Sequence, residues 1–139
     1  MLKIWCYTIS NLNSLYGPPL LPPTSPPPPT SGDATCEGLP ATIVGTDGND
    51  NLEGTEGYDV IVGFGGDDRI EGFGGRDTIC GDEGDDNIDG GDGSDRMFGE
   101  NDNDHLTSIE GEVNNDNLDG GSGTDTCDSD PDPEVNCES

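Results

Sequence analysis

Residues 45–128 repeat with a period of nine, and this period restricts the possible folds more than any other feature of the chain. Nine units follow one another, with a three-residue insert at 108–110. Glycine opens the units, at Gly45, Gly54, Gly63, Gly72, Gly81, Gly90, Gly99, Gly111 and Gly120. Aspartate is sixth, at Asp50, Asp59, Asp68, Asp77, Asp86, Asp95, Asp104, Asp116 and Asp125. The eighth position holds Leu52, Ile61, Ile70, Ile79, Ile88, Met97, Leu106, Leu118 and Cys127.

Each unit divides into a turn-forming part and a strand-forming part. The first six residues are rich in Gly, Asp and Asn, which tolerate positive φ, and the last three suit a short strand. In such a strand the middle side chain points opposite to its neighbours, so position eight faces inward and positions seven and nine face outward. Two units then close one turn of a flattened coil. The predicted fold is all-β: a right-handed parallel β-roll of nine nonapeptide repeats over residues 45–128.

The segments that flank the repeats differ from them in composition. Residues 1–34 combine a weak leader-like start with a proline-rich stretch, whose prolines forbid helix and favour extended polyproline II. We expect this segment to be a disordered linker. Residues 35–44 are predicted to form an N-terminal cap strand, because 42–44 continue the period and place Ile43 in the inward column. Residues 129–139 are predicted to form an acidic C-terminal cap.

The charge of the chain restricts its partners. It has 31 acidic residues against 4 Lys and Arg, a formal net charge of −27. Self-repulsion of this size opposes a compact state unless cations neutralise it, and it excludes nucleic acid as a natural partner. No stretch approaches the roughly 20 apolar residues of a membrane helix, so no membrane span is expected.

The units resemble the RTX, or haemolysin-type, calcium-binding nonapeptide G-G-x-G-x-D-x-U-x. This resemblance implies that each calcium ion lies between two turns stacked one coil apart, held by backbone carbonyls and by the sixth-position Asp of both turns. Such a site suits Ca²⁺, because it is a hard ion that accepts about six to eight oxygen ligands in flexible geometry. The metal residues that the resemblance implies are the nine sixth-position aspartates with Gly45, Gly48, Gly54, Gly57, Gly63, Gly66, Gly72, Gly75, Gly81, Gly84, Gly90 and Gly93.

The resemblance also implies how the aspartates pair. Four pairs lie in loops that keep glycine at position four: Asp50 with Asp68, Asp59 with Asp77, Asp68 with Asp86, and Asp77 with Asp95. Three later pairs fit the pattern less well: Asp86 with Asp104, Asp95 with Asp116, and Asp104 with Asp125. In that region Asp102 and Asn114 replace the position-four glycine, and the insert changes the spacing. We therefore expect about four well-formed calcium sites, and up to about seven.

The cysteines indicate an oxidising compartment. The chain contains Cys6, Cys36, Cys80, Cys127 and Cys137. Five cysteines are many for a short chain with few apolar residues, and we therefore expect an extracellular or secreted protein. We expect a Cys127–Cys137 disulfide to clip the C-terminal cap over the end of the core, and Cys6 to stay unpaired.

One outward face of the roll is apolar enough to be covered. Its side chains include Val60, Val62, Cys80 and Phe98. We expect the segment 36–39 to lie across this face, tied to it by a Cys36–Cys80 disulfide. The alternative is an exposed patch on a fragment of a larger protein.

The sequence predicts a binding module and not an enzyme. The single histidine, His105, falls in an outward column, and neither G-x-S-x-G nor zinc-binding spacing is present. Inward side chains are too few to offset the conformational entropy of ordering the repeats, so calcium binding and folding should be one event. The alternative is the non-catalytic C-terminal module of a larger secreted enzyme or of a surface adhesin, with a surface or carbohydrate ligand besides calcium.

Overall fold

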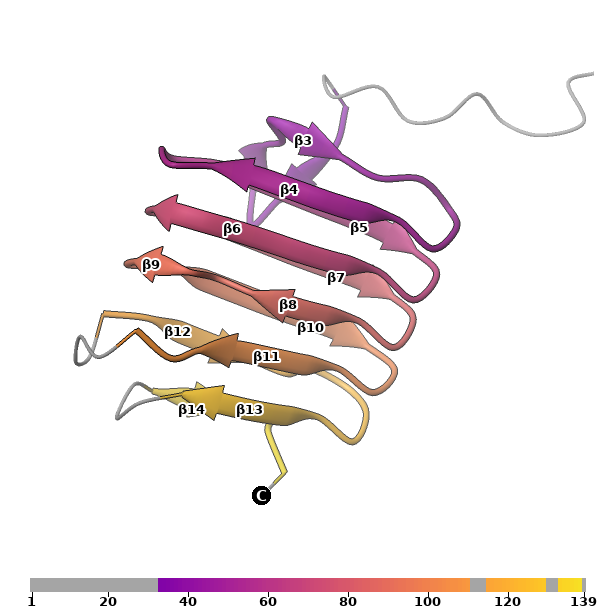
Figure 1. Cartoon of the computed structure of the whole chain (residues 1–139). Coiled ribbons are helices and arrows are strands. Elements are labelled where there is room, and N and C mark those ends of the chain that lie inside the picture. Colours follow the sequence, from indigo (N-terminus) through magenta and orange to yellow (C-terminus); the bar gives the residue numbers. More distant parts are fainter. Residues whose placement is uncertain (1–32, 111–114, 130–132, 139) are drawn as a thin grey trace, which may run out of the picture.

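The computed structural model describes residues 33–110, 115–129 and 133–138, which form a flattened parallel β-solenoid of about five turns (Figure 1). One sheet contains, in order, β3 (Ile43–Val44), β5 (Val60–Gly65), β7 (Thr78–Glu83), β10 (Arg96–Asn101), β12 (Asn117–Asp119) and β14 (Glu134–Val135). The other contains β4 (Asn51–Thr55), β6 (Arg69–Gly75), β8 (Asn87–Asp89), β11 (His105–Ser108) and β13 (Thr126–Ser129). A short strand, β9 (Asp92–Gly93), pairs with the end of β6. The predicted all-β parallel roll is confirmed.

Several expectations fall outside the described residues. They concern the linker, with Cys6, and the loop positions Gly111 and Asn114. In the part of the chain that the structure describes, no helix is long and apolar enough to cross a membrane.

The register of both sheets follows the repeat. Ile61 lies opposite Ile79 in one sheet, so neighbouring strands are two units apart along the chain. The insert at 108–110 does not shift this register, because Met97 lies opposite Leu118 and the pairing stays parallel. The separation between stacked aspartates grows from 18 to 21 residues at this coil. The first residue of the insert, Ser108, ends β11 and lies opposite Ser129, and Ile109 and Glu110 follow the strand.

The eighth-position side chains form the interior column. The buried members of this core are Ile61, Ile70, Ile79, Ile88, Met97, Leu106 and Leu118. Ile43, Leu52 and Cys127 pack against it at the two ends, where they are partly buried. Full burial of each such side chain stabilises the fold by about 1.5–3 kcal/mol. The inward column predicted from the period is confirmed.

Several strands are longer than the three residues that the sequence suggested. β5 spans six residues and β6 spans seven, so both continue into the turn of the next unit. Each passes through a residue with positive φ, Phe64 at 78° and Phe73 at 72°. Pairing with the next coil continues there, since Phe64 lies opposite Asp82. Backbone pairing between coils thus orders part of the turns as well.

A second apolar cluster lies on the outward face of the β3–β5–β7 sheet. The antiparallel hairpin of β1 (Thr35–Cys36) and β2 (Leu39–Pro40) packs on this face. It buries Val60 and Val62, which are each 1% exposed. A Cys36–Cys80 disulfide ties the hairpin to β7. The covered face and this disulfide agree with the sequence prediction.

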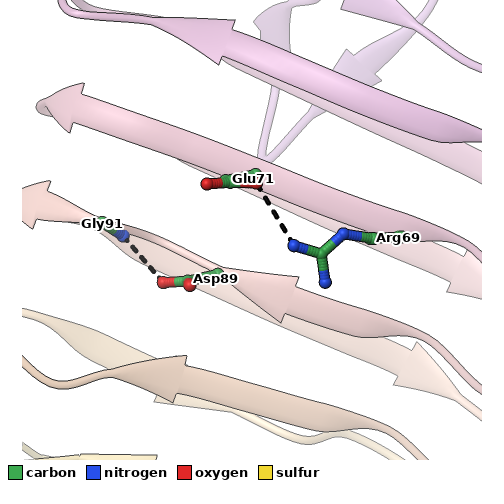
Figure 2. A network of polar contacts seen from close by, with 4 residues as sticks. All are labelled: Arg69, Glu71, Asp89 and Gly91. Atoms are coloured by element: carbon green, nitrogen blue, oxygen red, sulfur yellow. Dashed lines mark hydrogen bonds and ion pairs between the residues drawn. The ribbon is translucent and has the colours of Figure 1, made fainter.

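The outward face of the other sheet is polar. Figure 2 shows Arg69 and Glu71 on β6 and Asp89 at the end of β8. An exposed ion pair joins Arg69 Nη2 to Glu71 Oε2 at 3.3 Å, and Asp89 Oδ1 accepts a hydrogen bond from the Gly91 N–H at 3.2 Å. Exposed pairs of this kind add little stability, so this face is a solvated surface.

The C-terminal tail closes the far end of the roll. β14 adds a last parallel strand to β12, with Leu118 opposite Glu134. A Cys127–Cys137 disulfide holds the tail in place, as the sequence predicted. Disulfides therefore fix one segment to the outward face of β5 and β7 and another to the C-terminal end of the roll.

Position along the solenoid should determine how much each core residue contributes to stability. Ile79 is fully buried in the centre and Ile43 is half-buried at the N-terminal end of the same column. We expect Ile79→Ala to lower the free energy of unfolding of the calcium-loaded protein by about 2–5 kcal/mol, the usual range for such a cavity. Ile43→Ala should cost less than half as much. Equal losses in urea unfolding would contradict this view of the core.

Candidate metal centre

The sixth-position aspartates form two rows of stacked carboxylates, one along each edge of the roll. In each row the Oδ1 of one aspartate accepts a hydrogen bond from the backbone N–H of the aspartate one coil earlier, at 2.7–2.9 Å. The donor and acceptor pairs are Asp50 and Asp68, Asp59 and Asp77, Asp68 and Asp86, Asp77 and Asp95, Asp86 and Asp104, Asp95 and Asp116, and Asp104 and Asp125. These are the seven pairs that the resemblance to the nonapeptide repeat implied.

The second carboxylate oxygen of most of these aspartates is buried without a protein partner. Among the described residues, the Oδ2 atoms in this state include those of Asp68, Asp77, Asp86, Asp95, Asp104 and Asp125. Each of these residues is at most 3% exposed. Burying an ionised carboxylate oxygen with no donor is costly, and a bound cation removes that cost. The aspartates therefore fit the metal that the repeat implies.

Several first-position glycines lie close to an unpartnered oxygen and leave no room for a larger side chain. A Cβ placed on Gly63 would lie 2.4 Å from Asp68 Oδ2 and 2.6 Å from the carbonyl oxygen of Gly81, one coil later. A Cβ on Gly72 would lie 2.7 Å from Asp77 Oδ2 and 2.4 Å from the Gly90 carbonyl oxygen. A carboxylate oxygen and a carbonyl oxygen of the next coil thus lie close to the same glycine. Such all-oxygen surroundings suit Ca²⁺.

Backbone oxygens matter here because side chains alone would not suffice. Within the described ranges, no three His, Cys, Asp or Glu side chains are grouped in a way that could hold a metal ion. The stacking supplies two carboxylates per pair of loops, and the remaining ligands would be carbonyls of the glycine-rich turns. The role of the glycine carbonyls as ligands stays a prediction.

Burial disfavours the ionised form of the stacked carboxylates. It raises the pKa of Asp77 and Asp104 to about 6, and that of Asp86 and Asp95 to about 7. The hydrogen bond from the preceding aspartate's N–H opposes this effect, while neighbouring carboxylates add to it. Burial likewise raises the pKa of Asp68. Without a cation, neutral pH therefore places unfavourable charge inside the roll.

Threonines satisfy the aspartates of the first coil, which have no earlier loop to donate to them. Asp50 Oδ2 accepts from the Thr46 N–H at 2.6 Å and from its hydroxyl at 2.8 Å. Asp59 Oδ2 accepts from the N–H and hydroxyl of Thr55, both at 2.8 Å, and its Oδ1 accepts from the Thr42 hydroxyl at 3.2 Å. The sequence analysis assigned no role to these threonines. Their recurrence at position two of both first-coil units is the signal that could have found them.

The later loops keep the stacking that the earlier ones show. Asp102 replaces a position-four glycine but adopts a φ of 74°, in the same left-handed region as Gly66, Gly75 and Gly84. The ladder hydrogen bonds continue across the insert, with the Asp95 N–H donating to Asp116 Oδ1 at 2.7 Å. The irregular sequence of the late loops therefore does not interrupt the rows of carboxylates.

A parallel solenoid whose turns stack buried aspartates beside backbone carbonyl oxygens defines a calcium-binding β-roll module. The family model of the RTX calcium-binding nonapeptide repeat (4 copies) matches residues 44–79, 71–106 and 108–131. The chain belongs to this family. No curated protein and no solved structure gave a match.

Adding a methyl group to a first-position glycine tests whether the close packing beside the aspartates is needed. Gly72→Ala should lower the free energy of unfolding at a fixed calcium concentration by about 1–3 kcal/mol, the usual cost of overpacking, because the new methyl would overlap Asp77 Oδ2 and the Gly90 carbonyl. Gly65→Ala is the control, since a Cβ there comes no closer than 3.8 Å to its neighbours and Gly65 is not a proposed metal residue. Denaturant unfolding in calcium measures both. Equal losses of unfolding free energy in the two variants would contradict the need for close packing at Gly72.

The buried aspartates predict how pH affects the chain. Their folded pKa values of about 6–7 lie above the unfolded value of 3.8, so the metal-free roll retains protons that the unfolded chain releases. This stability is fully present below pH 3.8 and is lost as pH rises through 6 to 7. We expect β circular dichroism in calcium-free buffer to increase as pH falls from about 7.5 to 5.

The calcium-loaded chain should show the opposite response over the same range. Protons compete with calcium for the carboxylates, so the calcium concentration at half-folding should rise as the pH falls. A midpoint that stays constant from about pH 7.5 to 5, or a metal-free chain that loses β signal on acidification, would contradict the assigned environment of the aspartates.

Proposed function

We propose that this chain is a secreted module that binds calcium ions between stacked loops and folds when it binds them. The observation that carries the proposal is the row of buried aspartates whose Oδ2 atoms lack a protein partner. The proposed metal residues are the nine sixth-position aspartates and the first- and fourth-position glycines of the first six units. Seven stacked pairs give up to seven sites.

Folding coupled to calcium follows from what the metal-free roll would lack. Its interior is one apolar side chain wide, so hydrophobic burial per residue is small. Its carboxylates are buried close together in a chain of net charge −27. Divalent cations offset this repulsion and complete the coordination of the buried oxygens. A preformed site does not exist in the unfolded chain, so binding energy becomes folding energy.

Two disulfides support secretion. Cys36–Cys80 and Cys127–Cys137 each fix a cap segment to the roll, and such bonds persist in oxidising compartments. Weak calcium sites that are coupled to folding also suit an extracellular space, where calcium is abundant. We propose four segments: a linker at 1–34, an N-terminal cap at 35–44, the roll at 45–128 and a C-terminal cap at 129–139.

The proposal includes no catalytic role. His105 lies near both Thr107 and Asp128, a combination that invites comparison with a nucleophile–base–acid triad. Both contacts use the same ring nitrogen, however: Nε2 is 3.3 Å from Thr107 Oγ1 and 3.6 Å from Asp128 Oδ2. A triad needs one nitrogen for the nucleophile and the other for the carboxylate. This cluster on the outward polar face is therefore a surface contact.

A role within a larger protein is compatible with this function. The module could serve as the non-catalytic C-terminal part of a secreted enzyme or of an adhesin. A shallow hollow outside the aspartate rows, lined by Phe98, Glu100, Asn101 and Asn136 among others, offers polar groups and one aromatic ring. This hollow is our candidate place for a surface or carbohydrate ligand.

Calcium titration of the chain tests the proposed function. We expect the metal-free chain at neutral pH to be largely disordered and to gain β structure cooperatively, with a midpoint around 10⁻⁴–10⁻³ M as for extracellular modules. Circular dichroism follows the transition. Magnesium is the control, because it demands small octahedral sites and keeps its water, so it should not fold the chain at the same concentration. The same β spectrum in excess chelator would refute coupled folding.

A further inference from the structure

The C-terminal tail continues the hydrogen-bonding pattern of the aspartate row beyond the last repeat. The Asp125 N–H has no following loop to receive it, and Glu138 Oε2 accepts it instead at 2.7 Å. The Glu138 N–H in turn donates to the Asp125 carbonyl at 2.7 Å. Within the roll the corresponding carbonyl of Asp50 accepts from the N–H of Arg69, one coil later, at 3.0 Å. Glu138 thus makes the backbone contact of the residue that follows the next coil's aspartate, and its side chain makes the contact of that aspartate.

The tail also makes the close contacts that the next coil makes with a first-position glycine. A Cβ on Gly120 would lie 2.5 Å from the carbonyl oxygen of Asn136 and 2.9 Å from the carboxyl carbon of Asp125. One coil earlier, a Cβ on Gly99 would lie 2.6 Å from the Gly120 carbonyl and 2.3 Å from Asp104 Oδ2. The Asn136 carbonyl therefore takes the place that a glycine carbonyl has in the repeats.

The carboxylate at this end has an oxygen available for a ligand. Asp125 is 1% exposed, and its Oδ2 has no hydrogen-bond partner among the described residues. Its Oδ1 is used by the Asp104 N–H at 2.9 Å. The carboxyl carbon of Asp125 lies close to Gly120. Glu138 is exposed, so its carboxylate can approach an ion from solvent.

Covalent and backbone contacts hold the tail in this position. The Cys127–Cys137 disulfide fixes the residue between Asn136 and Glu138 to the last strand. The Gly120 N–H donates to the Val135 carbonyl at 3.0 Å, as the Gly45 N–H does to Val62 at 2.8 Å. The tail is therefore placed as a partial coil, although its sequence contains no nonapeptide motif.

We propose that loop 120–125 and tail residues 136–138 form one further calcium site at the C-terminal end of the roll. Asp125 and Glu138 supply two carboxylates, and Asn136 supplies a carbonyl oxygen. Two negative charges balance one divalent cation, and the all-oxygen set suits Ca²⁺. This inference rests on the proposed function, since it extends calcium binding from the repeats to a segment outside them. The ion would join the cap to the array.

Counting bound calcium in the full-length oxidised chain tests this site. Equilibrium dialysis at saturating calcium compares the unmodified chain with Glu138→Gln, which removes the charge but keeps an oxygen that can accept the Asp125 N–H. Glu134→Gln is the matched control: it makes the same charge change in the same tail, where Glu134 accepts from the Ser129 hydroxyl and has no contact with Asp125. We expect Glu138→Gln to bind one ion fewer and Glu134→Gln to bind the full number.

A second variant guards against a folding defect in the first. Replacing both Cys127 and Cys137 by Ser frees the tail without altering a ligand, and should weaken the same single ion. The terminal site is refuted if neither Glu138→Gln nor the double cysteine variant changes the ion count, or if Glu134→Gln loses an ion equally. If the unmodified chain binds calcium and only this comparison fails, the function of the repeats stands. If it binds none, both proposals are wrong.

Discussion

The hydrogen bond from the N–H of one aspartate to the carboxylate of the next coil's aspartate is the interaction on which the rest of the structure depends. It fixes the stacking distance between turns and spends one oxygen of each carboxylate on the backbone. The other oxygen is then left buried and without a protein donor along most of both rows. Burial of this kind raises the carboxyl pKa values, so the packing that orders the turns also creates the need for a cation or a proton. The same stacking of aspartates thus orders the turns and leaves carboxylate oxygens that suit a cation.

Each hydrogen bond of the aspartate rows runs from an N–H to the carboxylate of the next coil. The first carboxylates therefore lack a donor and the last N–H lacks an acceptor, and other residues of the chain supply them. At the N-terminal end, the aspartates of the first coil lack donors, and threonine hydroxyls with their N–H groups provide them. At the C-terminal end, the Asp125 N–H lacks an acceptor, and Glu138 provides one. A solenoid needs such atypical end segments, since each unit is otherwise completed only by its neighbours. Here the ends are completed by hydrogen-bonding chemistry as well as by covering the core.

The apolar part of the structure is divided into two thin layers. One is the interior column of eighth-position side chains, and the other lies between the β1–β2 hairpin and the outer face of β5 and β7. The second layer requires the hairpin to stay in place, and the Cys36–Cys80 disulfide meets that requirement. This chain of high charge and glycine content therefore combines small apolar clusters, two covalent links and turns with stacked carboxylates, without a conventional core.

The sequence by itself determined the features that repeat: the inward column, the pairing of aspartates one coil apart, and the resemblance to the calcium-binding nonapeptide. A period of nine constrains these because each column holds the same local geometry in every unit. The apolar outward face, with Cys80 in it, also predicted that the segment 36–39 covers it, although not that this segment is a hairpin. Only the tertiary structure decided which carboxylate oxygen each backbone N–H uses, how far strands continue into turns, and how the insert fits without breaking the row. It also decided the roles of Thr46, Thr55 and Glu138, because these arise where the repeat ends and depend on contacts between segments that share no periodic pattern.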